Sequence, residues 1–284
     1  YQVTSYGTLG LYKNLKKFSD SVLTTPEREE LHQLAFSSSP KYNSEFVFEV
    51  SSHGISKGRI RDFPINIAAI TNLSQDHLDF HKTFINYKNT KFKLFKKHLL
   101  NNGIAILNDN IKNINKLKKE LKIKNIKIIS YGKNKSDINR FVYNKNRIRL
   151  KIYNKYYLID YQFISKFELD NLSCSIGCCL AIGLNITEII KIVSKVKRAQ
   201  GRMEFVAQLK NGSKVFVDYA HTPDALKNIL ISMIFRKKKP DLVFGCGGNR
   251  DKSKRIKMGE IANKYANKIY ITDDNPRDEN PSII

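Results

Sequence analysis

The stretch INIAAITNLSQDHLDFH, residues 65–81, combines two patterns that decide the fold. Its first part is a short apolar run, which predicts a buried β-strand over residues 65–71. Its second part is polar and carries Asp76, His77, Asp79 and His81. In open α/β sheets, ligands bind beyond the carboxyl ends of the strands. The stretch therefore predicts an α/β sheet with a candidate site at the end of this strand.

Apolar runs alternate with amphipathic segments on both sides of this stretch. The sequence predicts strands over residues 46–50, 103–107 and 126–131. Helical periodicity covers residues 84–99 and a lysine-rich segment that ends near residue 122. This alternation is typical of βαβ units and of a mostly parallel sheet.

The pattern changes after residue 140. Short apolar runs at residues 141–143, 148–152 and 156–159 are separated by Asn and Lys turns, which predicts an antiparallel addition to the sheet. Helical segments follow at residues 168–183 and 187–195.

A second βα series begins after residue 200. It contains predicted strands at residues 205–209, 215–219, 242–246 and 269–272, and predicted helices at residues 223–235 and 253–265. We therefore predict two domains, residues 1–200 and 201–284, joined by a hinge near Gly201.

The composition is strongly basic. The 284 residues include 50 Lys and Arg against 26 Asp and Glu, a formal net charge of +24. The lysines are spread along the chain among Asn and Ile residues, which indicates a compositional bias more than a nucleic-acid groove. We therefore expect no nucleic-acid partner. A basic nucleic-acid-binding protein is kept as the alternative from a different function class, supported by charge alone.

The cysteines and the hydropathy pattern indicate in which cellular compartment the protein resides. Cys174, Cys178, Cys179 and Cys246 form no CxxC pair and are typical of buried, reduced thiols. No apolar run is long enough to span a membrane, and no signal peptide is visible. These features favour a cytoplasmic protein with no membrane partner. Because the chain starts at Tyr1 without Met, we expect that the natural N-terminus lies upstream.

Two carboxylate-bearing segments are candidates for a cation site. Glu49 falls within the apolar run at residues 46–50, where a carboxylate is costly unless it is paired or ligates a cation. The segment Asp76 to His81 offers oxygen and imidazole donors, which suit Mg²⁺ with one assisting histidine. A structural salt bridge at Glu49 and a polar helix start at Asp76 are the alternatives.

Two loops near the C-terminus are candidates for anion recognition. The loop GCGGNRDK, residues 245–252, follows a predicted strand and leads into a helix, so its backbone amides can approach an anion. The loop DDNPR, residues 273–277, places charged groups on a proline-stiffened turn. Simple exposed turns are the alternative for both.

Seven segments, taken together and in order, resemble the Mur ligases. They are Thr24-Thr25-Pro26, FEVSSHGI (residues 48–55), TNLSQDHLDFH (71–81), GRMEFV (201–206), VDYAHTPDAL (217–226), FGCGGNRDKSKR (244–255) and TDDNPR (272–277). The resemblance covers nearly the whole chain and is strongest to the members that add meso-diaminopimelate. It implies an α/β fold with a truncated three-layer central ATPase-type domain and part of a Rossmann-like C-terminal domain.

The resemblance also implies a reaction. A Mur ligase of this kind is an ADP-forming enzyme of peptidoglycan biosynthesis that joins meso-diaminopimelate to UDP-N-acetylmuramoyl-L-alanyl-D-glutamate. ATP, which is a substrate, phosphorylates the γ-carboxylate of the dipeptide, and the amine then attacks the acyl phosphate. Mg²⁺ is the implied cofactor. The implied partners are these small molecules alone.

Site residues follow from the resemblance, position by position. Lys91 matches a carbamylated lysine and, with Glu49 and His77, a metal site; Lys91 and His77 are the catalytic candidates. Thr24, Thr25, Ser51 and Arg59 match contacts to the UDP-muramoyl dipeptide. Asn171, Arg202 and Asp218 match positions near ATP, with His221 as a weaker candidate. Arg250, Asp274, Asn275, Pro276 and Arg277 match the meso-diaminopimelate site.

The chain also departs from the family pattern. Leu23 stands where Asn is usual, Lys57 stands where Gln is expected, and Glu168 replaces an Asn of the adenine site. No GxxxxGK loop followed by Ser or Thr occurs in the 284 residues. The resemblance places that loop upstream of Tyr1, with an uridine-binding domain before it and more of the C-terminal domain after residue 284. We therefore expect these 284 residues alone to be inactive. Another Mur ligase or a folylpolyglutamate synthetase-like ligase is the alternative within the same chemistry.

Overall fold

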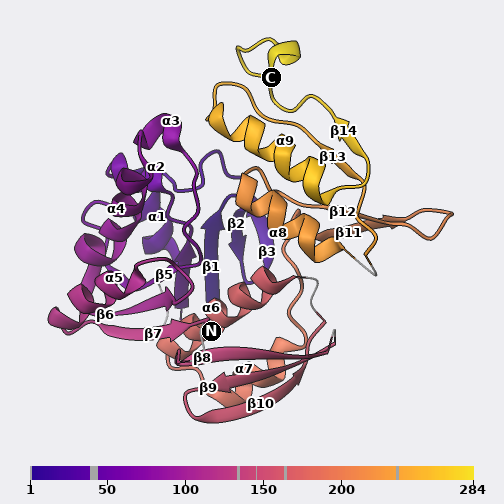
Figure 1. Cartoon of the computed structure of the whole chain (residues 1–284). Coiled ribbons are helices and arrows are strands. Elements are labelled where there is room, and N and C mark those ends of the chain that lie inside the picture. The colour runs from indigo at the N-terminus through magenta and orange to yellow at the C-terminus, as the bar shows by residue number, and fades with distance from the viewer. Residues whose placement is uncertain (1, 39–43, 133–134, 145, 163–164, 235–236) are drawn as a thin grey trace. The chain divides into compact units, whose positions relative to one another are not determined.

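Strands and helices alternate through most of the chain. The computed structural model describes residues 2–38, 44–132, 135–144, 146–162, 165–234 and 237–284 (Figure 1). These residues form a mixed α/β fold, as the sequence predicts. They cluster into two compact units, Tyr1–Ala68 with Ile85–Ala105 and Lys116–Ile128, and Ala69–Phe84 with Ile106–Asn115 and Ile129–Ile284. The predicted domain boundary at residues 200 and 201 stays a prediction.

The first unit contains a four-stranded sheet with the order β3-β2-β1-β4. Its strands are β1 (Gln2–Gly7), β2 (Gly10–Lys13), β3 (Lys16–Ser19) and β4 (Ser44–Phe48). β1 runs antiparallel to β2 and parallel to β4. Two helices lie in the same segment, α1 (Arg28–Ser38) and α2 (Ser52–Ser56). The sequence predicts only β4 among these elements.

A second sheet has six strands in the order β10-β9-β8-β7-β6-β5. They are β5 (Ile65–Ile70), β6 (Leu99–Asn108), β7 (Lys127–Tyr131), β8 (Ile138–Asn144), β9 (Arg147–Ile152) and β10 (Lys155–Asp160). β7 pairs with β8 in parallel, whereas β8, β9 and β10 pair antiparallel. The predicted antiparallel addition is therefore confirmed.

Helices separate or follow these strands along the chain. They are α3 (Leu78–His81), α4 (Phe84–Lys93) with a π-helical continuation (Leu94–His98), α5 (Ile114–Ile123), α6 (Lys166–Ala181) and α7 (Ile186–Val193). The predicted helix over residues 84–99 is confirmed, with its last turn wound as a π-helix.

The chain from residue 204 onward forms a second βα series. Its elements are β11 (Glu204–Gln208), β12 (Lys214–Val217), α8 (Pro223–Met233), β13 (Leu242–Phe244), α9 (Ser253–Tyr265), β14 (Ile269–Ile271) and a 3₁₀ turn (Pro281–Ile283). β11 pairs antiparallel with β12, and β13 pairs parallel with β14. The predicted end of the helix at residue 235 lies outside the described residues.

The two helices of this series share one apolar core. Leu226 and Leu230 of α8 pack with Met258 of α9, and Leu242 and Phe244 of β13 pack against them. Figure 1 shows α8 and α9 side by side next to β13 and β14. This core fixes where the loops after β13 and β14 begin.

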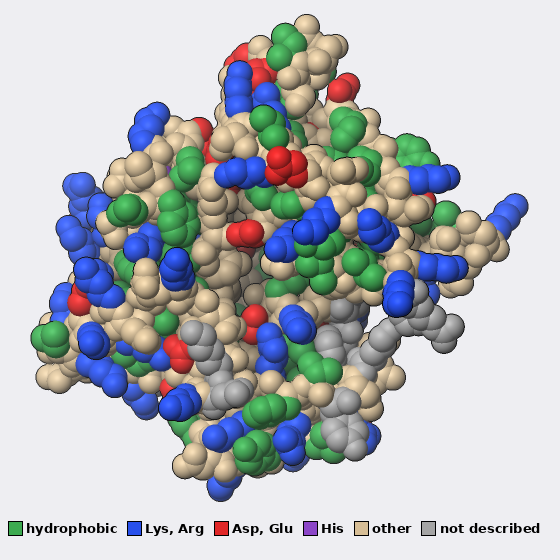
Figure 2. Space-filling model, in the orientation of Figure 1, with side chains coloured by type: hydrophobic (Ala, Val, Ile, Leu, Met, Phe, Trp, Pro, Cys, Tyr) green, Lys and Arg blue, Asp and Glu red, His purple; other side chains and the backbone are tan. Residues whose placement is uncertain are grey.

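Basic side chains are spread over the face of the molecule that Figure 2 shows. Figure 2 shows Lys and Arg across the visible face, interspersed with hydrophobic and other side chains. Within the part of the chain that the structure describes, no helix is both long and apolar enough to cross a membrane. All four cysteines are free thiols.

Helix α6 approaches the six-stranded sheet closely at Gly177. A Cβ at this position would lie 2.9 Å from Cγ2 of Ile106 and 3.5 Å from Cδ1 of Ile138. A larger residue here must displace the side chain of Ile106 or push α6 away from the sheet, because interiors are close-packed. Gly259 in α9 offers the contrast, since an added Cβ there meets nothing within 4 Å.

We expect Gly177→Val to lower the free energy of unfolding by about 1–3 kcal/mol, because overpacking forces neighbouring side chains apart. Gly259→Ala is the matched control and should raise the free energy of unfolding by about 0.5–1 kcal/mol through helix propensity. Urea denaturation of the two variants measures both effects. Equal stability of Gly177→Val and the wild type would contradict the described packing of α6.

Candidate functional site

The ends of β1 and β4 bring Thr8 and Glu49 together. Both residues directly follow a strand, and the two strands are parallel, so their carboxyl ends meet at one edge. Oε2 of Glu49 accepts hydrogen bonds from the backbone N–H of Thr8 at 2.9 Å and from its hydroxyl at 2.7 Å. Glu49 is exposed and lies beyond the end of β4. The interpretation of Glu49 as a carboxylate inside an apolar strand is therefore wrong.

The predicted dipeptide residues gather beside Glu49. Thr25 is fully buried, and its hydroxyl lies 2.9 Å from the carbonyl oxygen of Glu49 and accepts from the N–H of Ser51 at 2.8 Å. The hydroxyl of Ser51 in turn caps α2 by accepting from the N–H of Gly54. Thr25 thus fixes the position of Ser51 from within the structure.

Thr24 and Arg59 complete this group. The hydroxyls of Thr24 and Thr8 are 3.2 Å apart. The guanidinium of Arg59 donates to the carbonyl oxygen of Thr25 at 3.1 Å and pairs with Glu27 at 2.8 Å. Arg59 is buried, and its contacts with Thr25 and Glu27 hold the segment around Thr25 in place. The structure therefore brings all four predicted dipeptide residues together.

The segment after β5 forms a second group around Asp76, in the second unit. Nε2 of His77 and Nε2 of His221 each lie 3.4 Å from Oδ2 of Asp76, and Nζ of Lys254 lies 4.0 Å from Oδ1. Burial alone would raise the pKa of Asp76, but the hydrogen bond to His221 and the charges of His77 and Lys254 lower it to about 2. Asp76 is therefore an anion that joins three distant parts of the sequence.

His77 itself has unusual backbone and protonation properties. Its φ of 54° lies in the left-handed region, which few non-glycine residues adopt. Burial lowers the pKa of His77 below its usual range, although Asp76 opposes this effect. At neutral pH the imidazole is therefore uncharged, which is the form that binds metals. The sequence assigned no role to Lys254, although this residue belongs to the segment FGCGGNRDKSKR (residues 244–255) that resembles the Mur ligases.

Two of the predicted ATP-site residues lie together at the end of β12. The guanidinium of Arg202 lies over the ring of Tyr219, 4.5 Å from its centroid. The carboxylate of Asp218 accepts from the N–H groups of Met203 and Ala220, both at 2.8 Å. His221 stands next to Tyr219 with the ring centroids 5.2 Å apart. Asn171 is exposed on α6.

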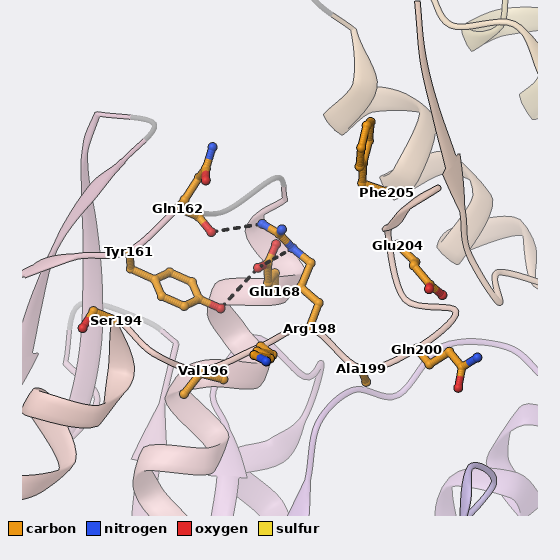
Figure 3. A pocket seen from close by; sticks show the side chains of 11 residues that line it. Tyr161, Gln162, Glu168, Ser194, Val196, Arg198, Ala199, Gln200, Glu204 and Phe205 are labelled. Atoms are coloured by element: carbon orange, nitrogen blue, oxygen red, sulfur yellow. Dashed lines mark hydrogen bonds and ion pairs between the residues drawn. The ribbon is translucent and has the colours of Figure 1, made fainter. Parts of the chain in front are cut away.

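A pocket of about 620 Å³ lies where the segment after α7 passes the start of α6 (Figure 3). Oε1 of Glu168 accepts from the hydroxyl of Tyr161 at 3.2 Å and from Nε of Arg198 at 3.1 Å. Arg198 also donates to the carbonyl oxygen of Gln162 at 3.0 Å. Burial, and then the charge of Glu168, raise the pKa of Tyr161 to about 12. Sequence reasoning missed Tyr161 and Arg198.

The two loops of the predicted diaminopimelate site are joined directly. The N–H of Gly248 donates to the carbonyl oxygen of Asn275 at 2.9 Å, and the guanidinium of Arg277 donates to the carbonyl oxygen of Gly248 at 2.6 Å. Arg250 is exposed, and its side chain makes no hydrogen bond or ion pair with any described residue. A pocket of about 140 Å³ lies beside these loops and is lined by Cys246, Arg255 and Asp274 among others.

The predicted metal ligands belong to different units. Glu49 and Lys91 are in the first unit and His77 is in the second, so their convergence stays a prediction. Lys91 lies on α4 with its Nζ 5.1 Å from the ring centroid of Tyr87. Among the described residues, no group of three or more His, Cys, Asp and Glu side chains forms a ready metal site.

Comparison with known proteins gives the family. The Mur ligase middle domain matches residues 2–179, and the Mur ligase glutamate ligase domain matches residues 201–284. The chain belongs to the Mur ligase family.

Among its relatives, the chain is 40% identical over 293 residues to the UDP-N-acetylmuramoyl-L-alanyl-D-glutamate–2,6-diaminopimelate ligase of Rickettsia conorii, with 100% of this chain and 60% of that protein covered. The chain thus spans about three fifths of the length of the curated relatives that it matches. The relative of Fusobacterium nucleatum with the same name is 37% identical, with 99% of this chain and 58% of that protein covered.

Solved structures agree with this assignment. A structure of a UDP-N-acetylmuramoyl-L-alanyl-D-glutamate–2,6-diaminopimelate ligase superposes with a TM-score of 0.66 at 28% identity, covering 99% of this chain and 58% of that one. A bifunctional folylpolyglutamate synthase/dihydrofolate synthase superposes with a TM-score of 0.68 at 14% identity, covering 97% of this chain and 70% of that one. At that identity the second likeness shows the fold alone.

The ion pair of Glu168 with Arg198 should stabilise the structure measurably. The two side chains are 14% and 33% exposed, so solvent screens the pair only in part. In a double-mutant cycle of Glu168→Ala and Arg198→Ala, we expect a coupling of about 0.5–1.5 kcal/mol in the free energy of unfolding. The matched control is the pair of Arg147 with Asp160, whose side chains are 44% and 72% exposed. That pair should give less than about 0.5 kcal/mol; an equal coupling in both cycles would contradict this prediction.

Proposed function

We propose that this chain serves an ATP-dependent ligase that joins meso-diaminopimelate to UDP-N-acetylmuramoyl-L-alanyl-D-glutamate in peptidoglycan biosynthesis. The observation that carries the proposal is the pair of loops after β13 and β14, which hold Arg250 and Arg277 on neighbouring strand ends. Arginine can bind carboxylates in a bidentate manner. The relatives at 37–40% identity, whose names state this ligation, support it.

The dipeptide is proposed to bind at the edge formed by β1 and β4. Thr24 and Ser51 offer hydroxyls, while Thr25 and Arg59 hold these groups in place through the contacts described above. ATP phosphorylates the γ-carboxylate of the D-glutamate, and the amine of diaminopimelate displaces phosphate from the acyl phosphate. Cationic side chains that are fixed in advance stabilise the charge that develops on the phosphoryl and carbonyl oxygens.

The nucleotide is proposed to bind near the end of β12 and the start of α6. Arg202 and Asp218 are fixed there by Tyr219 and by backbone N–H groups. The pocket beside Glu168 is walled by Gln200 and Glu204, on either side of Arg202 in the sequence. Asn171 lies one helical turn from Glu168 on α6. These positions support a base site in the pocket, with Glu168 in place of the usual Asn.

Mg²⁺ suits the donors that the chain offers. Glu49 is an exposed carboxylate whose Oε2 is oriented by two hydrogen bonds from Thr8, and the imidazole of His77 is uncharged at neutral pH. A carbamylated Lys91 would add a second anionic oxygen donor, and hard oxygen donors are those that Mg²⁺ prefers. When bound by Glu49, His77 and Lys91, the ion would neutralise charge on the phosphate oxygens.

Asp76 is proposed to orient the imidazoles on either side of it. It lies 3.4 Å from the rings of both His77 and His221, and its own charge is fixed by the low pKa. A histidine that ligates a metal commonly has its ring held by such a neighbouring carboxylate. This arrangement supports a catalytic role for His77.

The remaining parts of the proposal concern organisation. The boundary between the two domains is proposed at residues 200 and 201, with a hinge near Gly201. The location is proposed to be the cytoplasm, and the partners are proposed to be the small-molecule substrates, without nucleic acid or membrane. A folylpolyglutamate synthase-like activity is the second candidate within the same fold, which the structural likeness favours only at the level of architecture.

Lys91 should be carbamylated in the active protein. Its replacement in Lys91→Ala removes the proposed anionic ligand, so we expect activity to be lost and partly restored by a short carboxylic acid such as acetate. Lys93→Ala, an exposed lysine on the same helix, is the matched control and should keep activity. A coupled assay of ADP release by the full-length enzyme measures both. Full activity of Lys91→Ala would refute the carbamylation.

Arg250 should select diaminopimelate over L-lysine, which lacks the second carboxylate. Because the exposed side chain of Arg250 makes no hydrogen bond or ion pair with the described residues, Arg250→Ala should leave the fold intact and remove the proposed substrate contact. Loss of a charged partner costs about 2–5 kcal/mol, so the KM for diaminopimelate should rise by at least about thirty-fold while the KM for ATP changes little.

Steady-state kinetics of the full-length enzyme with each amino acid in turn tests this specificity and the proposed function together. Lys268→Ala, which removes an exposed charge after α9, is the control and should leave both KM values unchanged. A wild-type protein that uses L-lysine as efficiently as diaminopimelate would show the specificity to be wrong.

A further inference from the structure

Glu279 connects the two loops that follow β13 and β14. It lies two residues after Arg277, yet its carboxylate contacts the other loop, residues 245–252, and the first turn of α9. Oε1 accepts from the backbone N–H of Asn249 at 2.5 Å and from the guanidinium of Arg255 at 2.9 Å. Oε2 accepts from the same guanidinium at 3.1 Å and lies 3.2 Å from Nζ of Lys252.

This carboxylate is well enclosed by its donors. Its side chain is 16% exposed, and that of Arg255 is 13% exposed. The bidentate pair with Arg255 fixes the plane of the carboxylate, and such charge-assisted pairs are the strong ones. The hydrogen bonds to Arg255 and Asn249, together with Lys252, lower the pKa of Glu279 to about 2. The group is therefore charged throughout the physiological range.

The segments that Glu279 holds are locally strained. Asn249 has a φ of 50° and Arg277 has a φ of 51°, both in the left-handed region that non-glycine residues seldom adopt. A Cβ on Gly248 would overlap the carbonyl oxygen of Pro276, so the two loops are in direct backbone contact there. Residues in such conformations persist only when their surroundings fix them.

The contacts of Glu279 bear on recognition of the amino-acid substrate because they fix the backbone positions of Arg250 and Arg277. Arg250 follows Asn249, whose N–H Glu279 binds, and Arg277 donates to the carbonyl oxygen of Gly248 on the other side. If the loops separated, the backbone positions of Arg250 and Arg277 would no longer be held at a fixed spacing. A substrate with two carboxylates needs both cations at once, because each binds one end.

We propose that Glu279 is a positioning residue that clamps the loop at residues 245–252 to the loop at residues 272–279, and thereby sets the spacing of Arg250 and Arg277 for a dicarboxylic amino acid. The inference rests on the proposed function for its substrate, and the clamp itself rests on geometry alone. Both carboxylate oxygens of Glu279 are engaged by Asn249, Arg255 and Lys252, so we assign Glu279 an action on the amino acid through the loops.

The clamp is tested in the full protein by hydrogen exchange. Glu279→Gln keeps the shape of the side chain but removes its charge, and one of its two oxygens becomes an NH₂ group that faces Arg255. We expect amide exchange in residues 245–252 to accelerate at least about ten-fold, because exchange follows local opening. Exchange in β9 and β10 should be unchanged. Glu120→Gln, which breaks the pair with Lys96 in the first unit, is the matched control.

Kinetics then tests the consequence. In Glu279→Gln the KM for diaminopimelate should rise about ten-fold, with kcat and the KM for ATP within about two-fold of the wild type, since substrate contacts themselves remain. Glu279→Asp keeps the charge on a shorter side chain, so its KM for diaminopimelate should fall between those of the wild type and Glu279→Gln. If Glu279→Gln unfolds, as loss of protection in α8 and α9 would reveal, Glu279→Asp decides the question by the same two readouts.

The outcomes separate this inference from the proposed function. A wild-type protein that does not ligate diaminopimelate overturns the proposed function and the substrate of this inference. A wild-type protein that does, with an unchanged KM for diaminopimelate in both variants, overturns the positioning role alone. Unchanged exchange at residues 245–252 overturns the clamp, whatever the kinetics show.

Discussion

Parallel pairing of strands is the constraint on which the candidate sites depend. Where β1 and β4 run in the same direction, Thr8 and Glu49 follow their carboxyl ends and meet at one edge. Where β13 and β14 do so, the glycine-rich loop and the DDNPR loop emerge side by side and bond to each other. Antiparallel neighbours would send consecutive loops to opposite edges. In both regions, the direction of the paired strands thus determines which loops lie next to each other.

A few carboxylates organise a chain that is otherwise rich in positive charge. Asp76 gathers His77, His221 and Lys254, and Glu279 gathers Arg255, Lys252 and a backbone N–H. In a protein with a net charge of +24, cations are plentiful and repel one another. Each of these enclosed anions therefore decides which cations come together and where they point. The acidic side chains are as informative about the sites as the basic ones.

Much of the architecture could be predicted from the sequence, because apolar periodicity is a local signal. β5, β6, β7 and the three antiparallel strands follow from their runs, and the helices α4, α6 and α9 follow from their spacing. The first forty residues gave no such signal. There, β2 and β3 have only four residues each, and β3 is exposed along its whole length, so no alternation of apolar and polar residues marks it.

The site residues show the same division between local and distant information. Segment resemblance identified Thr25, Ser51 and Arg59, which the structure brings together, but only coordinates reveal that Thr25 is fully buried. Glu49 appeared to lie within a buried strand, because an apolar run does not show where pairing ends. Glu279, Arg198 and Tyr161 carried no signal in the sequence, since their partners are seven or more residues away.

The left-handed backbone of His77 restricts what evolution can place at that position. Besides Gly, the residues Asn, Asp and His tolerate a φ of 54° better than others, whereas Glu or Cys would add strain there. Asn and Asp also offer a donor atom, but both are shorter than His. As the proposed metal ligand, the imidazole at residue 77 therefore meets two independent requirements, one conformational and one chemical.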